Sequence, residues 1–157
     1  MLNTISTIDL KKMFEDIPRS CRYGYARVSS ISPEEKSSLE YQEQEFIKFN
    51  IPKENIRFEV NSTTGTISDR PVFYKLINHD LKENDLLIVT GMDRCSQKAL
   101  EFLQIQEKLF NKNVTFISLD LAYSNDMAAN KFIATYLAAL ATFEYNRRKG
   151  HQKQDNG

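Results

Sequence analysis

A serine and three arginines stand where the sequence could support chemistry on a phosphate group. Ser29 follows Arg27 by two residues, directly after a β-type run. Arg94 follows a second such run, and Arg70 comes after a polar loop. Arginine suits a pair of phosphate oxygens because its guanidinium group is planar, forked and permanently charged. Together with a serine hydroxyl, these side chains favour nucleophilic attack on a phosphodiester, since the arginines would stabilise the charge that develops on the non-bridging oxygens.

One carboxylate, Asp93, directly precedes Arg94 and belongs to the same candidate set. Acyl transfer fits less well, because neither His79 nor His151 follows a predicted strand, where it could serve as the base for a serine. A purely structural alternative stays open at this point. Serines after strands are common turn and cap residues, and most surface arginines simply face water.

Several other classes of site are excluded by their missing motifs. The chain has no G-x-x-x-x-G-K-[ST] phosphate loop, no G-x-G-x-x-G dinucleotide motif and no cluster of carboxylates for magnesium. The first predicted strand ends in Arg27 and Ser29, whereas phosphate-accepting receiver domains need acidic residues there. The two cysteines and two histidines lack the spacing of a metal site. We therefore predict neither a metal nor another cofactor.

Composition indicates one soluble domain without strong basic character. The 157 residues suit a single core, and 41% of them are hydrophobic. Lysine plus arginine equals aspartate plus glutamate, 21 against 21, so the case for DNA must depend on where the arginines lie. No apolar run has the length of a transmembrane helix or a signal-peptide core, which predicts a cytoplasmic protein with no membrane partner.

Four β-type runs alternate with longer helical patterns along the chain. The runs span residues 23–28, 56–60, 85–90 and 114–119. Such alternation predicts an α/β fold of three layers, with a mainly parallel sheet of four to five strands flanked by helices. In open α/β sheets the active site lies beyond the carboxyl ends of the strands, where the candidate residues are expected.

Helix boundaries follow from cap residues. The spacing of Ser37 and Glu40 resembles a capping box, and apolar residues then recur at helical period to Phe49. Pro71 suits the first turn of a short helix after Arg70. Ser96 is expected to cap a further helix that runs to about residue 110, and a short amphipathic helix is possible over residues 8–14.

The last predicted element is a long helix over about residues 127–148, roughly 33 Å in length. It carries two apolar stripes, of which the second consists of Phe132, Tyr136, Ala139 and Phe143. A helix that is apolar on two sides needs two surfaces to pack against. One is its own sheet, and the other is either a second subunit or further helices of the same chain. These two alternatives stay open.

Four segments, in order along the chain, resemble the resolvase/invertase, or serine recombinase, family. Residues 23–30 (YGYARVSS) are similar to its G-Y-A-R-V-S-[ST] opening, and residues 39–42 (LEYQ) continue the match. Residues 64–71 (TGTISDRP) resemble its S-G-x-x-x-x-R-P loop, and residues 84–94 (NDLLIVTGMDR) resemble G-D-x-[IL]-x-V-x-x-[LI]-D-R. Each motif is weak alone, and the ordered set is specific.

The resemblance implies a role for each matching residue. Ser29 resembles the nucleophile that forms a 5′-phosphoserine bond with DNA and frees a 3′-hydroxyl. Asp93 matches an acidic residue that orients the arginines, and Tyr25 matches a supporting position. Phosphate-binding catalytic arginines are matched by Arg27, Arg70 and Arg94. The family also implies DNA as partner, no metal or nucleotide, a homodimer built on the long helix, and a tetramer during strand exchange.

The resemblance also implies a domain organisation. We expect an N-terminal extension over residues 1–21, a catalytic domain over 22–148 that includes the long helix, and a tail over 149–157, with the usual C-terminal DNA-binding domain absent. A basic group at the end of the long helix is expected to contact DNA and consists of Arg147, Arg148 and Lys149. Cations at a helix carboxyl end also favour the helix dipole, and both explanations can hold.

This chain departs from the family pattern at four positions. Gln97 stands where the D-R-L-x-R motif ends in arginine, and Asn61 stands where the mobile loop usually has an acidic residue. Tyr145 and His151 occupy a region where relatives often carry further arginines. These departures keep a second hypothesis open, a catalytically impaired remnant that serves only as a DNA-associated dimerisation module. A third, an unrelated small-molecule-binding α/β domain, fits the ordered motifs poorly.

Overall fold

Four parallel strands form the sheet that the alternating pattern predicts. The computed structural model describes residues 11–12, 14–61, 67–96 and 98–122. The strands in these residues are β1 (Arg22–Val28), β2 (Ile56–Val60), β3 (Leu86–Val89) and β4 (Thr115–Ser118), in the order β2-β1-β3-β4. Every neighbouring pair is parallel. The predicted fold class is therefore confirmed, with each strand end within one residue of its predicted position.

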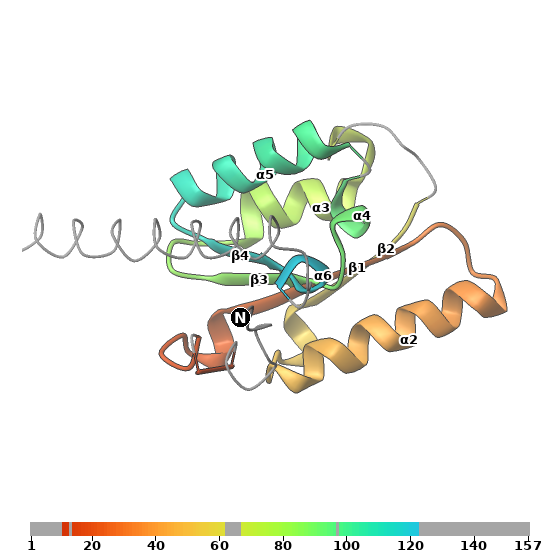
Figure 1. Cartoon of the computed structure of the whole chain (residues 1–157), viewed down its shortest axis with the longest axis horizontal. Helices are drawn as coiled ribbons and strands as arrows, with labels where there is room; N and C mark the ends of the chain where they lie inside the picture. The colour runs from red at the N-terminus through yellow and green to blue at the C-terminus, as the bar shows by residue number, and fades with distance from the viewer. Residues whose placement is uncertain (1–10, 13, 62–66, 97, 123–157) are drawn as a thin grey trace, which may run out of the picture.

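Helices cover both faces of this sheet and give the fold its three layers. Figure 1 shows α2 on one face and α3 with α5 on the other. The α-helices are α2 (Pro33–Lys48), α3 (Pro71–Lys75), α4 (Met92–Cys95), α5 (Ala99–Asn111) and α6 (Leu119–Ala122). Single turns add η1 (Arg19–Cys21), η2 (Lys53–Asn55), η3 (Ile67–Asp69) and the π-turn η4 (Leu76–Asp80). The predicted long helix lies outside the described residues.

The core divides into two clusters, one on each face of the sheet. Alternate residues of a strand point to opposite faces, so Leu86 and Ile88 of β3 join the cluster under α2, and Leu87 and Val89 join the cluster under α3 and α5. All four side chains are fully buried. A strand that is apolar on both faces is typical of a parallel sheet covered by helices on both sides.

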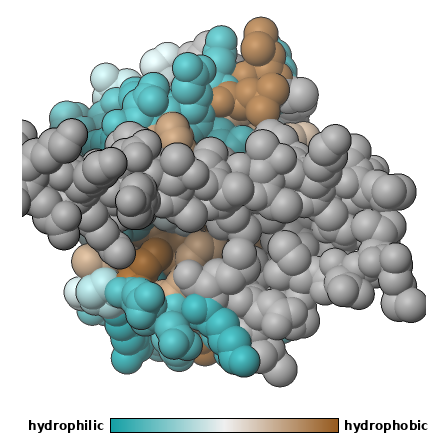
Figure 2. Space-filling model, turned by 60° about the vertical axis from the view of Figure 1, so that its left-hand side comes forward, coloured by the Kyte–Doolittle hydropathy of each residue, from teal (hydrophilic) through white to brown (hydrophobic). Residues whose placement is uncertain are grey.

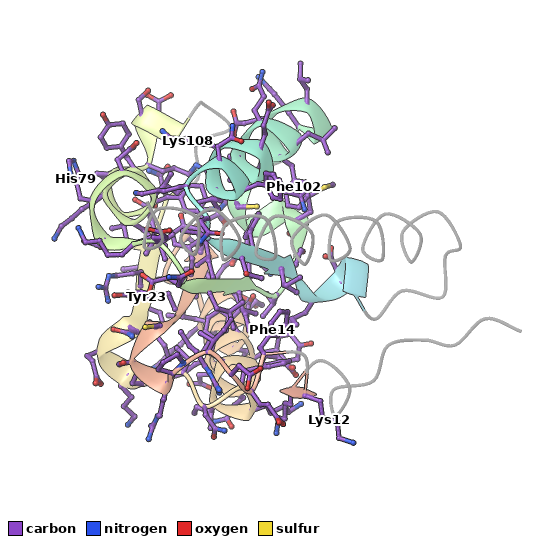
Figure 3. All side chains as sticks on the ribbon, turned by 90° about the vertical axis from the view of Figure 1, so that its left-hand side faces the viewer. Lys12, Phe14, Tyr23, His79, Phe102 and Lys108 are labelled. Carbon is purple, nitrogen blue, oxygen red and sulfur yellow. The ribbon has the colours of Figure 1, made fainter. Side chains whose placement is uncertain are left out.

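Part of the predicted N-terminal extension packs against the sheet. Phe14 is only 5% exposed and belongs to the cluster under α2, opposite Phe102 of α5 in Figure 3. The guanidinium group of Arg22 donates hydrogen bonds to the carbonyl oxygens of Ile17 (3.0 Å) and Phe49 (2.9 Å). These bonds tie the segment before β1 to the end of α2.

Two predicted helix starts are wrong. Helix α2 begins at Pro33, where Ser32 is the N-cap and its Oγ accepts a hydrogen bond from Glu35 N (3.3 Å). Ser32 and Glu35 repeat the spacing of the predicted cap at Ser37 one turn earlier, and Pro33 favours the earlier start. Ser96 does not cap α5, because its Oγ accepts from Lys98 N (3.1 Å) in the turn before that helix.

None of the helices in the described ranges combines the length and the apolar character needed to cross a lipid bilayer. Most of the coloured surface in Figure 2 is hydrophilic, with apolar atoms gathered in a few places. Leu100 and Leu103 of α5 are among the exposed apolar side chains.

Gly24 of β1 is expected to be the least replaceable glycine of the sheet. A Cβ atom there would lie 2.7 Å from Cδ2 of the Phe46 ring, a fully buried side chain of α2. We predict that Gly24→Ala lowers the free energy of unfolding by about 1–3 kcal/mol, because the ring must leave its packed position. Urea denaturation measures this. Gly91→Ala is the control, since its Cβ would meet the exposed carboxylates of Asp93 and Asp120, which can move away, and equal losses for the two variants would contradict the prediction.

Candidate active site

The hydroxyl of Ser29 lies exposed at the carboxyl end of β1. Its Oγ donates a hydrogen bond to Oε1 of Glu35 (3.0 Å), in the first turn of α2. A hydrogen bond from a hydroxyl to a carboxylate therefore connects the end of β1 to the first turn of α2. This position matches the predicted one, beyond the carboxyl end of a parallel strand and open to a ligand.

Arg27 is buried and organises the segments around Ser29. Its guanidinium group donates to the carbonyl oxygens of Asn61 (2.8 Å), Asp93 (2.9 Å) and Arg94 (3.2 Å). Its backbone N–H and C=O both pair with the amide side chain of Gln42, each at 3.2 Å. One side chain thus joins the ends of β1 and β2 to α4.

Arg94 returns to the same strand end from α4. Its Nη1 donates to the carbonyl oxygen of Arg27 (3.1 Å) and its Nη2 to Oγ of Ser38 on α2 (2.9 Å). The carboxylate of Asp93 lies 3.9 Å from Nε of Arg94 and is 64% exposed, so this ion pair is weak. The structure therefore brings three predicted site residues together, Arg27, Asp93 and Arg94.

Arg70 lies in a different environment. Its side chain is 3% exposed, and its Nη2 pairs with Oε1 of Glu101 on α5 (3.2 Å). The guanidinium carbon lies 4.8 Å from the centre of the Phe73 ring. In the described part of the chain, Arg70 therefore pairs with a residue of α5 and not with Ser29.

Tyr25 donates a hydrogen bond to a buried carboxylate. Its hydroxyl lies 2.6 Å from Oε1 of Glu59 on β2. The same carboxylate accepts from the backbone N–H groups of Val72 (2.9 Å) and Phe73 (3.1 Å), which holds the first turn of α3. Burial, followed by the bond to Glu59 and its charge, raises the pKa of Tyr25 well above its ordinary value. Tyr25 therefore keeps its proton and donates a hydrogen bond to Glu59 beneath the site.

Tyr25→Phe is expected to lower the free energy of unfolding by about 1.5–3 kcal/mol near neutral pH, because a buried carboxylate loses a donor. Above pH ~10 the unfolded chain releases the tyrosine proton while the folded chain keeps it, so the wild type loses stability with rising pH. The difference between the two proteins should therefore shrink above that pH. Denaturation curves between pH 7 and 11 measure it, with the exposed Tyr74→Phe as control. A difference that stays constant to pH 11 would contradict the raised pKa of Tyr25.

Cys95 is a packing residue beside this site. It is fully buried at the end of α4, and its Sγ donates to the carbonyl oxygen of Met92 (3.2 Å). Burial raises the pKa of its thiol to about 12, so the group stays protonated at neutral pH. Across the described ranges, no three His, Cys, Asp or Glu side chains form a group that could hold a metal ion.

Sequence reasoning did not identify the two glutamates of the site. The predicted helix start at Ser37 leaves Glu35 outside the helix, although its spacing from Ser32 is itself a capping-box signal that could have placed it inside. Glu59 lies between apolar residues on β2, and nothing in the neighbouring sequence indicates that its side chain is buried. Gln97 and the basic group Arg147, Arg148 and Lys149 lie outside the described residues, so their predicted roles stay predictions.

Comparisons with known proteins agree with this fold. A family model described as "Resolvase, N terminal domain" matches residues 22–155. A resolvase of Clostridium perfringens (strain 13 / Type A) is 32% identical over 124 residues, which are 77% of this chain and 62% of that protein. The Transposon Tn917 resolvase of Enterococcus faecalis is 28% identical over 122 residues, 78% of this chain and 61% of that protein. This chain thus spans less than two thirds of either protein.

Among solved structures, the N-terminal catalytic domain of TP901-1 integrase has a similar fold. The TM-score is 0.56, with 20% sequence identity, and the match covers 81% of this chain and 98% of that one.

Proposed function

Because this chain belongs to the resolvase N-terminal domain family, we propose that it is a serine recombinase catalytic domain that breaks and rejoins DNA with Ser29 as nucleophile. The observation that carries the proposal is the exposed Ser29 hydroxyl at the end of β1. Two residues before it, Arg27 donates to the backbone carbonyl of Arg94, and Arg94 donates to that of Arg27. A phosphate group at this strand end would meet a nucleophile and a cationic donor together.

The proposed reaction is a transfer of a phosphoryl group from DNA to the protein. Oγ of Ser29 forms a bond to phosphorus, the bond from phosphorus to the 3′-oxygen breaks, and the 3′-oxygen leaves as a hydroxyl. The 5′-phosphate then remains as an ester of Ser29. Rejoining reverses these steps when a 3′-hydroxyl attacks the ester. The ester retains the energy of the broken bond, so the reaction needs no nucleotide.

The site residues divide into two roles in this proposal. Arg94 donates hydrogen bonds to the phosphate in this proposal, because its side chain lies beside the strand end and is 26% exposed. Arg27 holds the surrounding backbone, Asp93 lies beside Arg94, and Tyr25 supports the site through its bond to Glu59. Arg70 would have to exchange its bond to Glu101 for one to phosphate, since its side chain is buried in the described structure.

The partners of this domain follow from the same proposal. DNA is the substrate, contacted in part by the basic group Arg147, Arg148 and Lys149. We propose a homodimer built on residues 127–148 and a tetramer during strand exchange. The proposed place of action is the cytoplasm, where the proposed DNA substrate would be reached.

A covalent adduct tests the proposal. The protein is incubated at low salt, where contacts to phosphate are strongest, with nicked duplexes of randomised sequence labelled on the strand that keeps the 5′-phosphate. We expect a labelled protein band that survives denaturation and disappears on protease digestion. No band at any DNA concentration would overturn the proposal and favour the non-catalytic dimerisation module. A band formed only through the 3′-phosphate would show a different reaction.

A further inference from the structure

We propose that Glu35 is the catalytic base of this site, the group that takes the proton from Oγ of Ser29 as the serine attacks phosphorus. This role rests on the proposed function of Ser29 as nucleophile. A hydroxyl is a weak nucleophile while it keeps its proton, so an adjacent acceptor is the usual means of activating it.

The distance and direction of the contact support this role. Oγ of Ser29 lies 3.0 Å from Oε1 of Glu35, within the range of about 2.6–3.2 Å in which a general base works. The bond has the required polarity, because the serine hydroxyl donates and the carboxylate accepts. Ser29 is exposed and Glu35 is partly exposed, so a bound phosphate could reach the serine without displacing the core.

The cap of α2 leaves this carboxylate available. In a capping box, the glutamate three residues after the N-cap serine reaches back to that serine's backbone N–H. Here Oγ of Ser32 accepts from Glu35 N, but Ser32 N donates to Oγ of Ser30 (3.4 Å). The carboxylate of Glu35 instead turns to Ser29. The helix start therefore fixes the backbone of Glu35 while its side chain serves the nucleophile.

Other carboxylates around the site are committed elsewhere. Glu59 accepts three hydrogen bonds from Tyr25 and the start of α3, and Glu101 pairs with Arg70. Asp93 lies beside Arg94. Within the described part of the chain, Glu35 is the carboxylate that accepts a hydrogen bond from Ser29.

Protons and bonds balance in the proposed step. The Oγ–H proton moves to Oε1 of Glu35, the Oγ–P bond forms, the P–O3′ bond breaks, and the 3′-oxygen takes a proton from a water molecule, which is released to solvent as hydroxide. During rejoining the attacking 3′-hydroxyl gives its proton to solvent, and the carboxylic acid of Glu35 returns its proton to Oγ of Ser29 as that oxygen leaves phosphorus. One residue thus serves both directions, as base in cleavage and as acid in rejoining.

Glu35→Gln tests the inference, because glutamine keeps a hydrogen-bond acceptor of the same shape but cannot take a proton. At saturating nicked DNA we expect the rate of adduct formation to fall by about 10²- to 10⁴-fold. Glu34→Gln is the matched control, since it removes the same charge from the adjacent residue in the first turn of α2. Its rate should stay near that of the wild type. Both variants should keep the wild-type midpoint of urea unfolding.

A second variant separates proton transfer from positioning. In Glu35→Ala, added formate should restore part of the rate, because a small carboxylate can occupy the vacated space and accept the proton. A residue that only positions the loop would not respond to formate. The inference is overturned if Glu35→Gln matches Glu34→Gln while the wild type forms an adduct on Ser29. If the wild type forms no adduct, or the adduct survives in Ser29→Ala, the proposed function itself fails and this role fails with it.

Discussion

Replacing Ser29 with alanine is expected to abolish the covalent protein–DNA adduct. The variant keeps Arg27, Arg94 and the proposed DNA contacts but has no oxygen at the position of attack. Removal of the nucleophile from another serine enzyme costs on the order of 10⁶ in rate, so the adduct should fall below detection. The measurement is the labelled-band assay on nicked DNA, followed by mapping of the modified peptide.

Ser30→Ala is the matched control for this prediction. Ser30 is the adjacent serine, it is also exposed, and its Oγ accepts a hydrogen bond from Ser32 N. It stands one residue out of the register in which Ser29 follows Arg27, so its loss should leave most of the adduct in place. An adduct mapped to Ser30, and retained in Ser29→Ala, would show that the nucleophile had been assigned to the wrong residue.

Arg27→Lys is expected to destabilise the protein and to impair cleavage together. A lysine keeps the charge, but a single ammonium group cannot span the three carbonyl oxygens that the guanidinium group joins. A buried polar group left without a partner costs about 1–3 kcal/mol, so we expect a total loss of roughly 2–5 kcal/mol in the free energy of unfolding. Two of these carbonyls belong to Asp93 and Arg94, so the side chain of Arg94, which is proposed to bind the phosphate, should also lose its position.

Two measurements on folded protein separate these effects. Urea denaturation gives the loss of stability, and adduct formation at a temperature where the variant is fully folded should be slower by about 10²-fold or more. Arg57→Lys is the control, because Arg57 is a half-buried arginine of the same sheet whose ion pair with Asp80 stays partly exposed. We expect its loss to stay below about 1 kcal/mol. A stable, fully active Arg27→Lys would refute the organising role.

Local pattern determined most of the fold. Strand β3 could be predicted because an apolar, β-branched run between polar loops is typical of a strand buried on both faces. Strands β1, β2 and β4 could be predicted from their aromatic and β-branched residues. Ser29 and Arg27 could be placed for the same reason, since they stand at the end of such a run. The family motifs added the identity of the chemistry, which composition alone, with zero net charge, would not have suggested.

Only the tertiary structure decided the partners of the site residues. Arg70 pairs with Glu101 across 31 residues, Tyr25 bonds Glu59 across 34, and Arg27 reaches carbonyls 66 and 67 residues away. These contacts depend on which strands are neighbours and on how each helix lies over the sheet, and neither is encoded in any short window of sequence.

The start of α2 shows the same limit at short range. Ser32 with Glu35 and Ser37 with Glu40 have the same capping spacing, so a local rule allows both starts. In the structure Pro33 occupies the first turn, and the helix docks over β1 with the ring of Phe46 against Gly24. The sequence therefore determined that a serine and a carboxylate lie close along the chain. Pro33 favours the earlier of the two starts, but the contact between Glu35 and Ser29 that follows from it is seen only in the structure.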